Sequence, residues 1–387
     1  MDKLTAQTIQ QRLTGPIATV TGLPNERYTS DQAFIHDRDN VVGTGWACLS
    51  FVEDLAERNF ARPIDFMGLP LVVTRDNQDN IRVFHNVCSH RGMELCDTPR
   101  KTNGMLRCPY HSWTYALDGQ LRGTPHIGGY GVHEHPDFDR GAHGLKEVRS
   151  HVWLNALFIN LSGDAPEFEI YAKPIIDRFN ELGSEQHLKN FMSNTEDCRT
   201  TLTVQSNWKL AVENFLEAYH LPTVHPELNQ ISPLQEHYHI EEFDNGAGQG
   251  SRNYSRMTLE NKHLPALAKW PTDKINLAEY PALYPNTFFG IHADQLFILY
   301  LQPVSAGETI EHVRISYVGE EALNDVFKTH RTRLLESWKS IFEEDIFAVE
   351  RMQKGRASPG YRGGAFSPVM DGPTVHFHRW VAGRLPG

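Results

Sequence analysis

The sequence predicts an α+β protein in which a small all-β module is inserted into a larger α+β domain that has an antiparallel sheet flanked by helices. Three observations predict this class. Short β-type runs separated by turns fill the chain from about residue 45 to 160. Strand-like runs then appear at 284–301 and 310–318, and a long helical pattern spans about 322–353. We therefore expect a β module at 45–160 and a larger domain formed by 1–44 and 161–387.

Turn signals separate the strands expected in the β module. The apolar runs 69–73 and 81–84 flank a polar turn at 75–77, which predicts a hairpin. The run 115–121 contains an Asp-Gly pair, which is typical of a short hairpin turn. The run 152–159 predicts one further strand.

The larger domain mixes helical and extended patterns. The expected elements, in order, are a short helix and an extended segment over 1–40, a helix within 166–190, a strand at 200–204, a helix over 208–220, and a long loop or lid over 229–275. The glycine-rich stretch 246–250 lacks a preceding buried strand and a following helix, so it does not predict a dinucleotide site.

Composition excludes several function classes. With 37 basic and 48 acidic residues the net charge is −11, and no basic block offers a surface for nucleic acid or an anionic membrane. The apolar run 152–161 is too short to span a bilayer, and the first residues do not form a signal core. Five cysteines are an odd number, which favours a reducing compartment, so we expect a cytoplasmic protein. The 20 histidines are the unusual feature.

The first histidine cluster is a pair of short motifs that suit a metal. Cys88 and His90 are separated by one residue, and Cys108 and His111 by two. Two thiolates and two imidazoles can bind a tetrahedral zinc ion or a Rieske [2Fe–2S] cluster. Spacing alone leaves both open. Small residues and turn-like surroundings favour the cluster, because they let backbone N–H groups reach its sulfides.

The flanking residues add a family resemblance. The stretches 86–92 and 106–115 closely resemble the cluster-binding segment of Rieske non-haem iron oxygenases. Most members of that family have glycine where this chain has Ser112, and the four ligand positions are all present. The resemblance implies that the two cysteines hold one iron and the two histidines the other.

A second cluster contains Glu217, His220 and His225. On a helix, Glu217 and His220 would share one face, and Pro222 would end the helix so that His225 could swing back. Two histidines and a carboxylate form the facial triad of non-haem Fe(II) oxygenases. Taken alone, the pattern also fits two unrelated histidines at a helix end.

This stretch matches the Glu/Asp-x-Tyr-His-x4-His signature of the same family, which implies that His220 and His225 hold a mononuclear iron. The segment 343–355 resembles the family stretch that carries the third ligand. That resemblance selects Asp345. The chain alone does not separate it from Glu343 and Glu344, which we otherwise interpret as ordinary solvated helix acids.

The resemblance also implies an electron path between subunits. In the family, a carboxylate three residues before the first histidine bridges the iron site to a cluster histidine of a neighbouring subunit. Here these residues would be Glu217 and His111, in a homotrimer. The alternative for Glu217 is a helix acid with a local structural role. The architecture implied is that of a ring-hydroxylating oxygenase alpha subunit, which uses O2 and receives electrons from a separate NAD(P)H-dependent reductase.

The expected substrate is a small quaternary ammonium compound of the betaine, choline or carnitine type. The Glu-x-Tyr-His form and its lead-in at 208–215 resemble the subgroup that hydroxylates such substrates, with N-demethylation or C–N cleavage as the result. An aromatic cage suits a quaternary cation. We expect it to include Tyr284, Phe289 and Tyr300, although aromatic residues on strands are more often core.

Two alternatives remain from the sequence. One is an aromatic-ring hydroxylating dioxygenase or an O-demethylase with an apolar pocket. The other is a non-catalytic Rieske electron carrier, which would need only the β module and leaves the second histidine cluster unexplained. A zinc-stabilised protein would be colourless, whereas a Rieske protein is red-brown.

Overall fold

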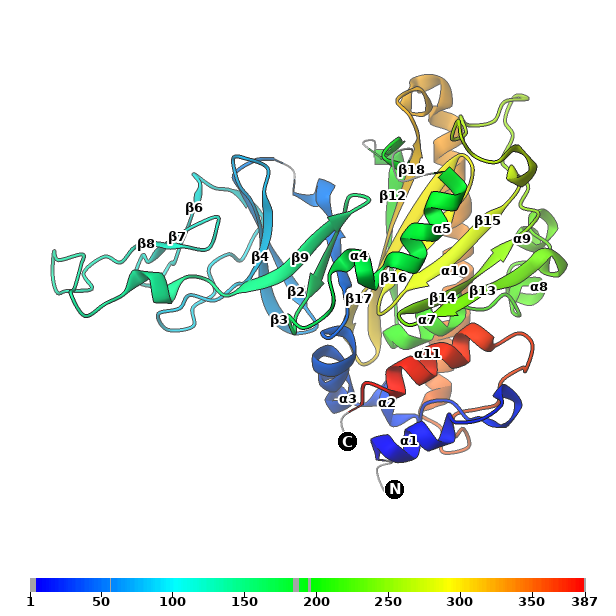
Figure 1. The fold of residues 1–387 in the computed structure, drawn as a ribbon, viewed down its shortest axis with the longest axis horizontal. Helices are drawn as coiled ribbons and strands as arrows, with labels where there is room; N and C mark the ends of the chain where they lie inside the picture. The colour runs from blue at the N-terminus through cyan, green and yellow to red at the C-terminus, as the bar shows by residue number, and fades with distance from the viewer. Residues whose placement is uncertain (1–4, 56, 184–187, 194–195, 386–387) are drawn as a thin grey trace. The chain divides into compact units, whose positions relative to one another are not determined.

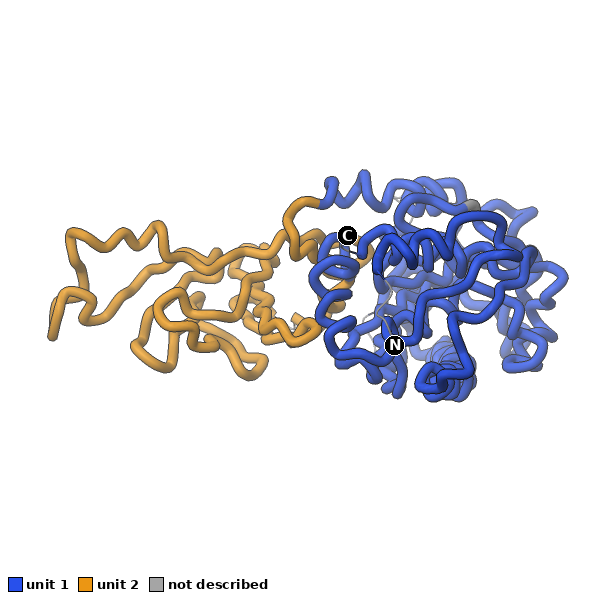
Figure 2. Tube along the Cα trace, turned by 90° about the horizontal axis from the view of Figure 1, so that it is seen from below, with its two compact units in different colours: residues 1–47, 165–387 blue, residues 48–164 orange. Residues whose placement is uncertain are grey.

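The chain folds into two compact units (Figure 2). The computed structural model describes residues 5–55, 57–183, 188–193 and 196–385. One unit consists of Met1–Ala47 and Ala165–Gly387, and the other of Cys48–Asp164, where the sequence predicted 45–160. The described part of the smaller unit is built on β-strands, and the larger unit combines a sheet with helices. The predicted α+β class with an inserted all-β module is confirmed.

The smaller unit contains two sheets in its described part. Seven strands follow the order β1-β10-β9-β4-β3-β2-β5, and three follow the order β6-β7-β8. The strands are β1 (Ala47–Phe51), β2 (Phe60–Phe66), β3 (Leu69–Arg75), β4 (Ile81–His85), β5 (Arg100–Lys101), β6 (Met105–Arg107), β7 (Thr114–Ala116), β8 (Leu121–Gly123), β9 (Glu147–Trp153) and β10 (Ala156–Asn160). The hairpin predicted from 69–73 and 81–84 corresponds to the antiparallel pair β3–β4.

The single strand predicted at 152–159 is wrong. Trp153 pairs with Ala156 across an antiparallel hairpin, so the run is divided between β9 and β10. Leu154 and Asn155 form the turn at φ values of 50° and 58°, the left-handed conformation that a two-residue hairpin turn of this type requires. Leucine is an unusual residue at such a position, and the apolar run therefore conceals the turn.

The larger unit is organised around one antiparallel sheet. Its described strands follow the order β11-β18-β17-β16-β15-β14-β13, and β12 also pairs with β18. The strands are β11 (Phe191–Met192), β12 (Arg199–Val204), β13 (His237–Phe243), β14 (Gly246–Ser251), β15 (Ala278–Leu283), β16 (Thr287–Ile291), β17 (Gln295–Ser305) and β18 (Glu308–Val318).

The described helices of the larger unit pack around this sheet (Figure 1). They are α1 (Ala6–Arg12), α2 (Glu26–Thr29), α3 (Asp31–His36), α4 (Phe168–Tyr171), α5 (Lys173–Gly183), α7 (Trp208–Phe215), α8 (Leu221–Val224), α9 (Pro226–Ile231), α10 (Lys328–Arg356) and α11 (Gly372–Ala382). Of the helix predicted within 166–190, residues 184–187 lie outside the described residues. No helix in the described ranges is long and apolar enough to cross a lipid bilayer.

Two neighbouring phenylalanines on β16 show how the two faces of the sheet are used. Phe288 stacks on Phe215 at the end of α7, with ring centroids 4.3 Å apart. Phe289 contacts Phe179 of α5 edge-on at 5.6 Å. Successive side chains on a strand point to opposite faces, so α5 covers one face and α7 the other. Figure 1 shows α5 and α10 on opposite sides of the sheet.

The long loop predicted over 229–275 is wrong in part, because β13 and β14 form two strands of the sheet. The glycines of β14 prevented its recognition as a strand from the sequence. A Cβ atom at Gly246 would lie 2.2 Å from the carbonyl oxygen of Ala282, and one at Gly248 would lie 2.5 Å from that of Tyr280. The close approach of the neighbouring strand therefore requires glycine at positions where sequence patterns predict a loop.

Two helix predictions and the prediction of an extended N-terminal segment also need correction. The helix expected over 208–220 ends at Phe215. The helix expected from 322 begins at Lys328, because Asn324 is extended between two short 3₁₀ turns. The N-terminal extended segment is replaced by α2, α3 and a π-helical turn at Asp37–Val42. The buried carboxylate of Asp37 forms ion pairs with Arg27 and the fully buried Lys209, which ties this segment to α7.

Candidate metal centres

In the smaller unit, two loops of matching geometry carry the cysteine–histidine motifs. The backbone N–H of Cys88 donates to the carbonyl oxygen of Met93, and that of Cys108 donates to Trp113, each at 2.8 Å. Both cysteines are 2% exposed and neither forms a disulfide. The two loops therefore present a buried thiol at equivalent positions.

The residue four positions after each cysteine has a positive φ. Gly92 has a φ of 75° and Ser112 a φ of 61°. This left-handed conformation explains why glycine suits the position and why serine is a departure there. The Ser112 hydroxyl accepts a hydrogen bond from Arg107 at 2.9 Å.

The two histidines lie together beside the cysteines. The ring centroids of His90 and His111 are 4.6 Å apart, and His90 stacks on Trp113 with an interplanar angle of 12°. The Nδ1 atom of His111 is buried and has no hydrogen-bond partner among the described residues. The Tyr115 hydroxyl lies 3.2 Å from the Cys88 sulfur. Two thiols and two imidazoles, one with an unpaired buried nitrogen, fit a Rieske cluster.

In the larger unit, His220, His225 and Asp345 converge. Potential ligand atoms of these three residues all lie within 4.8 Å of one another. Asp345 Oδ1 is 2.8 Å from His225 Nε2 and 3.5 Å from His220 Nε2. His225 is 2% exposed. Two imidazole nitrogens and one carboxylate oxygen are the donor set of a facial triad.

The other ring nitrogen of His220 and of His225, Nδ1, contacts a further carboxylate. His220 Nδ1 lies 2.6 Å from Glu217 Oε1, and His225 Nδ1 lies 2.7 Å from Glu344 Oε2. Such contacts place the N–H on Nδ1 and leave Nε2 free to bind a metal. The sequence interpretation of Glu344 as an ordinary solvated helix acid is therefore wrong. Glu343 pairs instead with Lys339 at the surface of the helix.

Glu217 and His220 do not share a helix face, contrary to the sequence prediction. Both lie between α7 and α8, in the segment after Phe215. Glu217 uses both carboxylate oxygens on His220, since Oε2 also accepts the backbone N–H of His220 at 3.1 Å. The turn thus brings the two side chains together where a helix was expected to do so.

Asp345 belongs to a stripe of side chains on α10 that lines a cavity. Trp338, Ile341, Phe342 and Asp345 all line it, and they recur at the i, i+3, i+4, i+7 spacing of one helix face. Glu343 is out of phase with this stripe. Helical phase is therefore a sequence signal that distinguishes Asp345 from Glu343.

The cavity has a volume of about 70 Å³ and is bounded at one side by His220, His225 and Asp345. Aromatic side chains form another part of its wall. Phe297 lies 4.7 Å from Trp338 and 5.7 Å from Phe342 between ring centroids, and Tyr280 lies 6.2 Å from Phe297. The Trp338 indole N–H donates to Gln295 at 2.9 Å, which holds the ring in place.

The predicted cage of Tyr284, Phe289 and Tyr300 is wrong, because none of the three lines this cavity. Tyr284 packs against residues of α11, with Trp380 at 5.1 Å. Tyr300 pairs with Thr287 in the sheet, which places its side chain on the same face as Phe289. That face lies away from α7 and α10.

A polar part of the cavity wall comes from residues that sequence reasoning did not select. His237, at the start of β13, lies 3.0 Å from Gln249 Oε1 through Nδ1 and 3.0 Å from Ser232 Oγ through Nε2. Burial lowers the pKa of His237. The pairing of β13 with β14 brings His237 and Gln249 together, and the sequence does not reveal that pairing.

Behind the aromatic wall lies His292, which is 1% exposed and has no hydrogen-bond partner on either ring nitrogen among the described residues. Its ring is 5.6 Å from those of Tyr280 and Trp338. Burial lowers the pKa of His292 to about 3. The folded protein therefore holds this imidazole neutral at neutral pH.

Because the unfolded chain protonates His292 near its ordinary pKa, stability is lost as pH falls below that value. We expect His292 to account for about 2 kcal/mol of destabilisation between pH 7 and pH 5. Denaturant unfolding of wild type and His292→Leu at both pH values measures this, and the variant should show the smaller loss. The exposed His263→Gln should behave as wild type. An equal pH dependence in His292→Leu would contradict the expectation.

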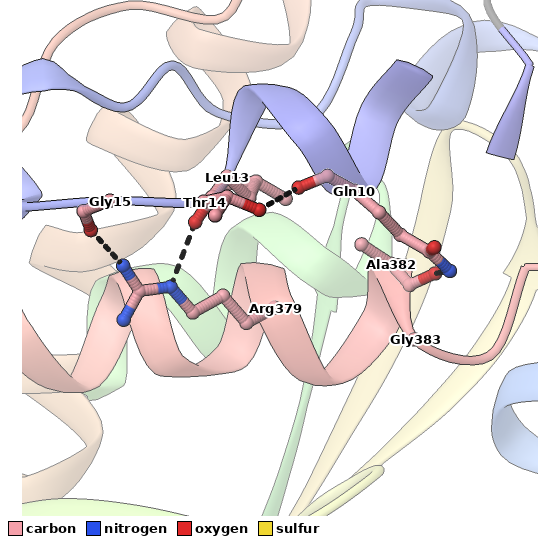
Figure 3. Close-up of a pocket in the computed structure, with 7 residues that line it drawn as sticks. All are labelled: Gln10, Leu13, Thr14, Gly15, Arg379, Ala382 and Gly383. Carbon is pink, nitrogen blue, oxygen red and sulfur yellow. Dashed lines mark hydrogen bonds between the residues drawn. The ribbon is translucent and has the colours of Figure 1, made fainter. Parts of the chain in front are cut away.

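A second hollow in the larger unit, of about 490 Å³, lies between α1 and α11 (Figure 3). Its charged group, Arg379, already donates to the carbonyl oxygens of Leu13 and Gly15. Gln10 donates to the carbonyl oxygen of Ala382. These contacts join the two helices, and no histidine, cysteine or carboxylate lines the hollow among the described residues.

Comparison with known families identifies both units. Residues 191–387 match the catalytic domain of the ring hydroxylating alpha subunit, and residues 45–136 match the Rieske [2Fe–2S] domain. The chain belongs to the ring-hydroxylating oxygenase alpha-subunit family. It is a Rieske non-haem iron oxygenase, which carries a [2Fe–2S] cluster and a mononuclear iron and uses O2. As the oxygenase component, it acts on a small molecule and receives electrons from a separate reductase.

The chain is similar to several individual oxygenases. The chain is 27% identical to the carnitine monooxygenase oxygenase subunit of Acinetobacter baumannii, over 88% of this chain and 86% of the relative. It is 24% identical to the glycine betaine monooxygenase oxygenase subunit of Pseudomonas aeruginosa, over 94% and 89%. A crystal structure of a quaternary ammonium Rieske monooxygenase shares the fold, with a TM-score of 0.78 at 23% identity and full coverage of both chains. Naphthalene 1,2-dioxygenase from Rhodococcus sp. also shares the fold, with a TM-score of 0.70 at 17% identity over 97% and 96%.

Proposed function

We propose that this oxygenase hydroxylates a small quaternary ammonium compound on an N-methyl group or on the carbon beside the nitrogen. One oxygen atom of O2 enters a C–H bond, and the other leaves as water with two electrons and two protons. An N-hydroxymethyl product then loses formaldehyde and a proton, which leaves the demethylated amine. Hydroxylation of the adjacent carbon leads instead to C–N cleavage.

In this proposal His220, His225 and Asp345 hold the iron, and Cys88, His90, Cys108 and His111 hold the cluster. The bound groups supply single electrons and O2 activation. Glu217 and Glu344 orient the two histidine ligands through their Nδ1 atoms. Asn214 donates to Asp345 Oδ1 at 3.1 Å and so fixes the direction of that carboxylate.

The aromatic wall of the cavity is the observation that supports a cationic substrate. Tyr280, Phe297, Trp338 and Phe342 line the same cavity as Asp345. A quaternary ammonium group cannot donate hydrogen bonds and is attracted to ring faces. The aromatic wall therefore suits a quaternary cation, which the ring faces attract, better than a neutral arene, which gains nothing from that electrostatic attraction.

For the electron path, we propose that Glu217 of one subunit meets His111 of the next in a homotrimer, and that an NAD(P)H-dependent reductase reduces the cluster. Exposed aromatic residues adjoin both groups. Tyr110 and Tyr219 are each 59% exposed, and Tyr110 lies 3.7 Å from the His111 ring. Exposed aromatic side chains are frequent at subunit interfaces, which supports contact at both places.

A substrate panel tests the proposal. With NADH and a surrogate reductase, choline, glycine betaine, carnitine and γ-butyrobetaine are compared with naphthalene and a methoxybenzoate by substrate-dependent O2 uptake and product formation. Turnover of at least one quaternary ammonium compound, and none of the arenes, is the expected result. Turnover confined to the arenes would overturn the proposal and favour a ring hydroxylase or O-demethylase.

Replacing Trp338 by leucine should weaken binding of a quaternary cation about tenfold, because the ring face is the attractive element. We expect KM for the best substrate in the panel to rise by this factor. The affinity for 3,3-dimethylbutan-1-ol, a neutral carbon analogue of choline used as a competitive inhibitor, should change much less. Phe347→Leu is the matched control, since Phe347 lies on the same helix but is 60% exposed. Equal losses for cation and analogue would contradict a cation–π role.

A further inference from the structure

We infer that the cavity selects quaternary ammonium substrates whose second polar group is uncharged, as in choline, over betaines of similar size that carry a carboxylate. The inference rests on the proposed function, because it assumes that the cationic group binds beside the triad. The inference concerns the end of the substrate that lies away from the ammonium group. The residues that line the cavity determine whether that end can carry a charge.

The charges around the cavity disfavour a second anion. No lysine or arginine lines the cavity among the residues that the structure describes, whereas Asp345 and Glu217 both line it. Glu344 adds a third carboxylate through its contact with His225. Three carboxylates outweigh the two positive charges of a ferrous ion. A substrate carboxylate in this space would lose its hydration without meeting a compensating cation.

The neutral polar groups of the wall offer little compensation. His237 contacts Gln249 through Nδ1 and Ser232 through Nε2. Gln249 in turn donates its amide hydrogen to the carbonyl oxygen of Phe215 at 3.2 Å. These groups are therefore already engaged with one another. A substrate hydroxyl needs only one exchangeable partner, such as the Ser232 hydroxyl, whereas a carboxylate needs several N–H donors or a cation.

Choline and glycine betaine test this inference, because both carry a trimethylammonium group on a two-carbon chain and differ in the hydroxyl or carboxylate end. We expect kcat/KM, from initial rates of substrate consumption with NADH and a surrogate reductase, to be at least about tenfold higher for choline. The amide of γ-butyrobetaine should likewise exceed γ-butyrobetaine. Equal or higher kcat/KM for the carboxylated member of both pairs would overturn the inference.

A positive charge introduced into the cavity wall tests whether electrostatics cause this selectivity. Leu228 on α9 is half-buried and lines the cavity. Leu228→Arg supplies the missing cation and should lower the choline to glycine betaine ratio at least about fivefold, whereas the neutral Leu228→Gln should leave that ratio near the wild-type value. A ratio in Leu228→Arg equal to that in Leu228→Gln would overturn the electrostatic explanation.

The substrate panel distinguishes a failure of the proposed function from a failure of the inferred selectivity. If arenes are consumed and no quaternary ammonium compound is, the proposed function itself is wrong. If kcat/KM for glycine betaine equals or exceeds that for choline, the proposed function stands and only the inferred selectivity is wrong.

Discussion

Replacing Asp345 by alanine is expected to abolish substrate turnover, by more than about 100-fold, while the visible spectrum of the [2Fe–2S] cluster stays unchanged. Asp345 supplies the carboxylate oxygen that meets both histidine nitrogens, and Asn214 holds it in place. Without it, two neutral imidazoles remain, and the mononuclear iron should be lost. Iron analysis, the cluster spectrum and O2 uptake measure the three consequences separately.

Glu343→Ala is the matched control for this variant. It removes a carboxylate two residues away on the same helix, but one that pairs with Lys339 and does not line the cavity. We expect its iron content and turnover to equal those of wild type. Loss of the cluster spectrum in Asp345→Ala, or retention of full turnover, would contradict the assignment of two separate metal centres.

Glu217→Gln is expected to retain both metal centres and yet to lose electron delivery to the iron, by about 100-fold or more. The amide keeps the shape of the side chain but removes the negative charge that faces His220 Nδ1 at 2.6 Å. Stopped-flow mixing of the pre-reduced protein with substrate and O2 measures this as the rate of cluster reoxidation. Glu227→Gln, an exposed residue on α9, is the control.

A purely structural role for Glu217 predicts a different result: iron would be lost and the reoxidation of the remaining sites would be unaffected. Co-expression of Asp345→Ala and His111→Ala subunits tests the subunit contact directly. Each variant lacks a different centre, so activity in the mixed oligomer requires transfer from one subunit to another. Absence of activity, with the expected metals present in each variant, would refute the transfer between subunits.

Much of the site could be predicted because metal ligands recur at short, characteristic spacings. His220 and His225 lie in one stretch, and Cys108 and His111 in another, so local sequence carries most of the donor set. The structure changes how these residues are presented. Glu217 reaches His220 across a turn rather than along a helix, because α7 ends at Phe215.

The substrate wall could not be predicted in the same way, because it depends on which strand face and which helix face meet. Phe289 and Phe297 are both buried aromatic residues on neighbouring strands, yet Phe289 faces α5 and Phe297 faces α10. The alternation of side chains along each strand determines which face a residue lies on. The sequence shows this alternation but does not indicate which of the two faces carries the site. Helical phase on α10 would have selected Trp338 and Phe342, given Asp345 as a reference.

The sequence by itself therefore indicated the family and the two kinds of metal centre, because short motifs of neighbouring residues carry both. Only the tertiary structure decided the surroundings of the iron site. Glu344 contacts His225 across 119 positions of sequence, and His237 meets Gln249 through strand pairing. The charge and shape of the cavity arise from such long-range contacts, which local patterns do not encode.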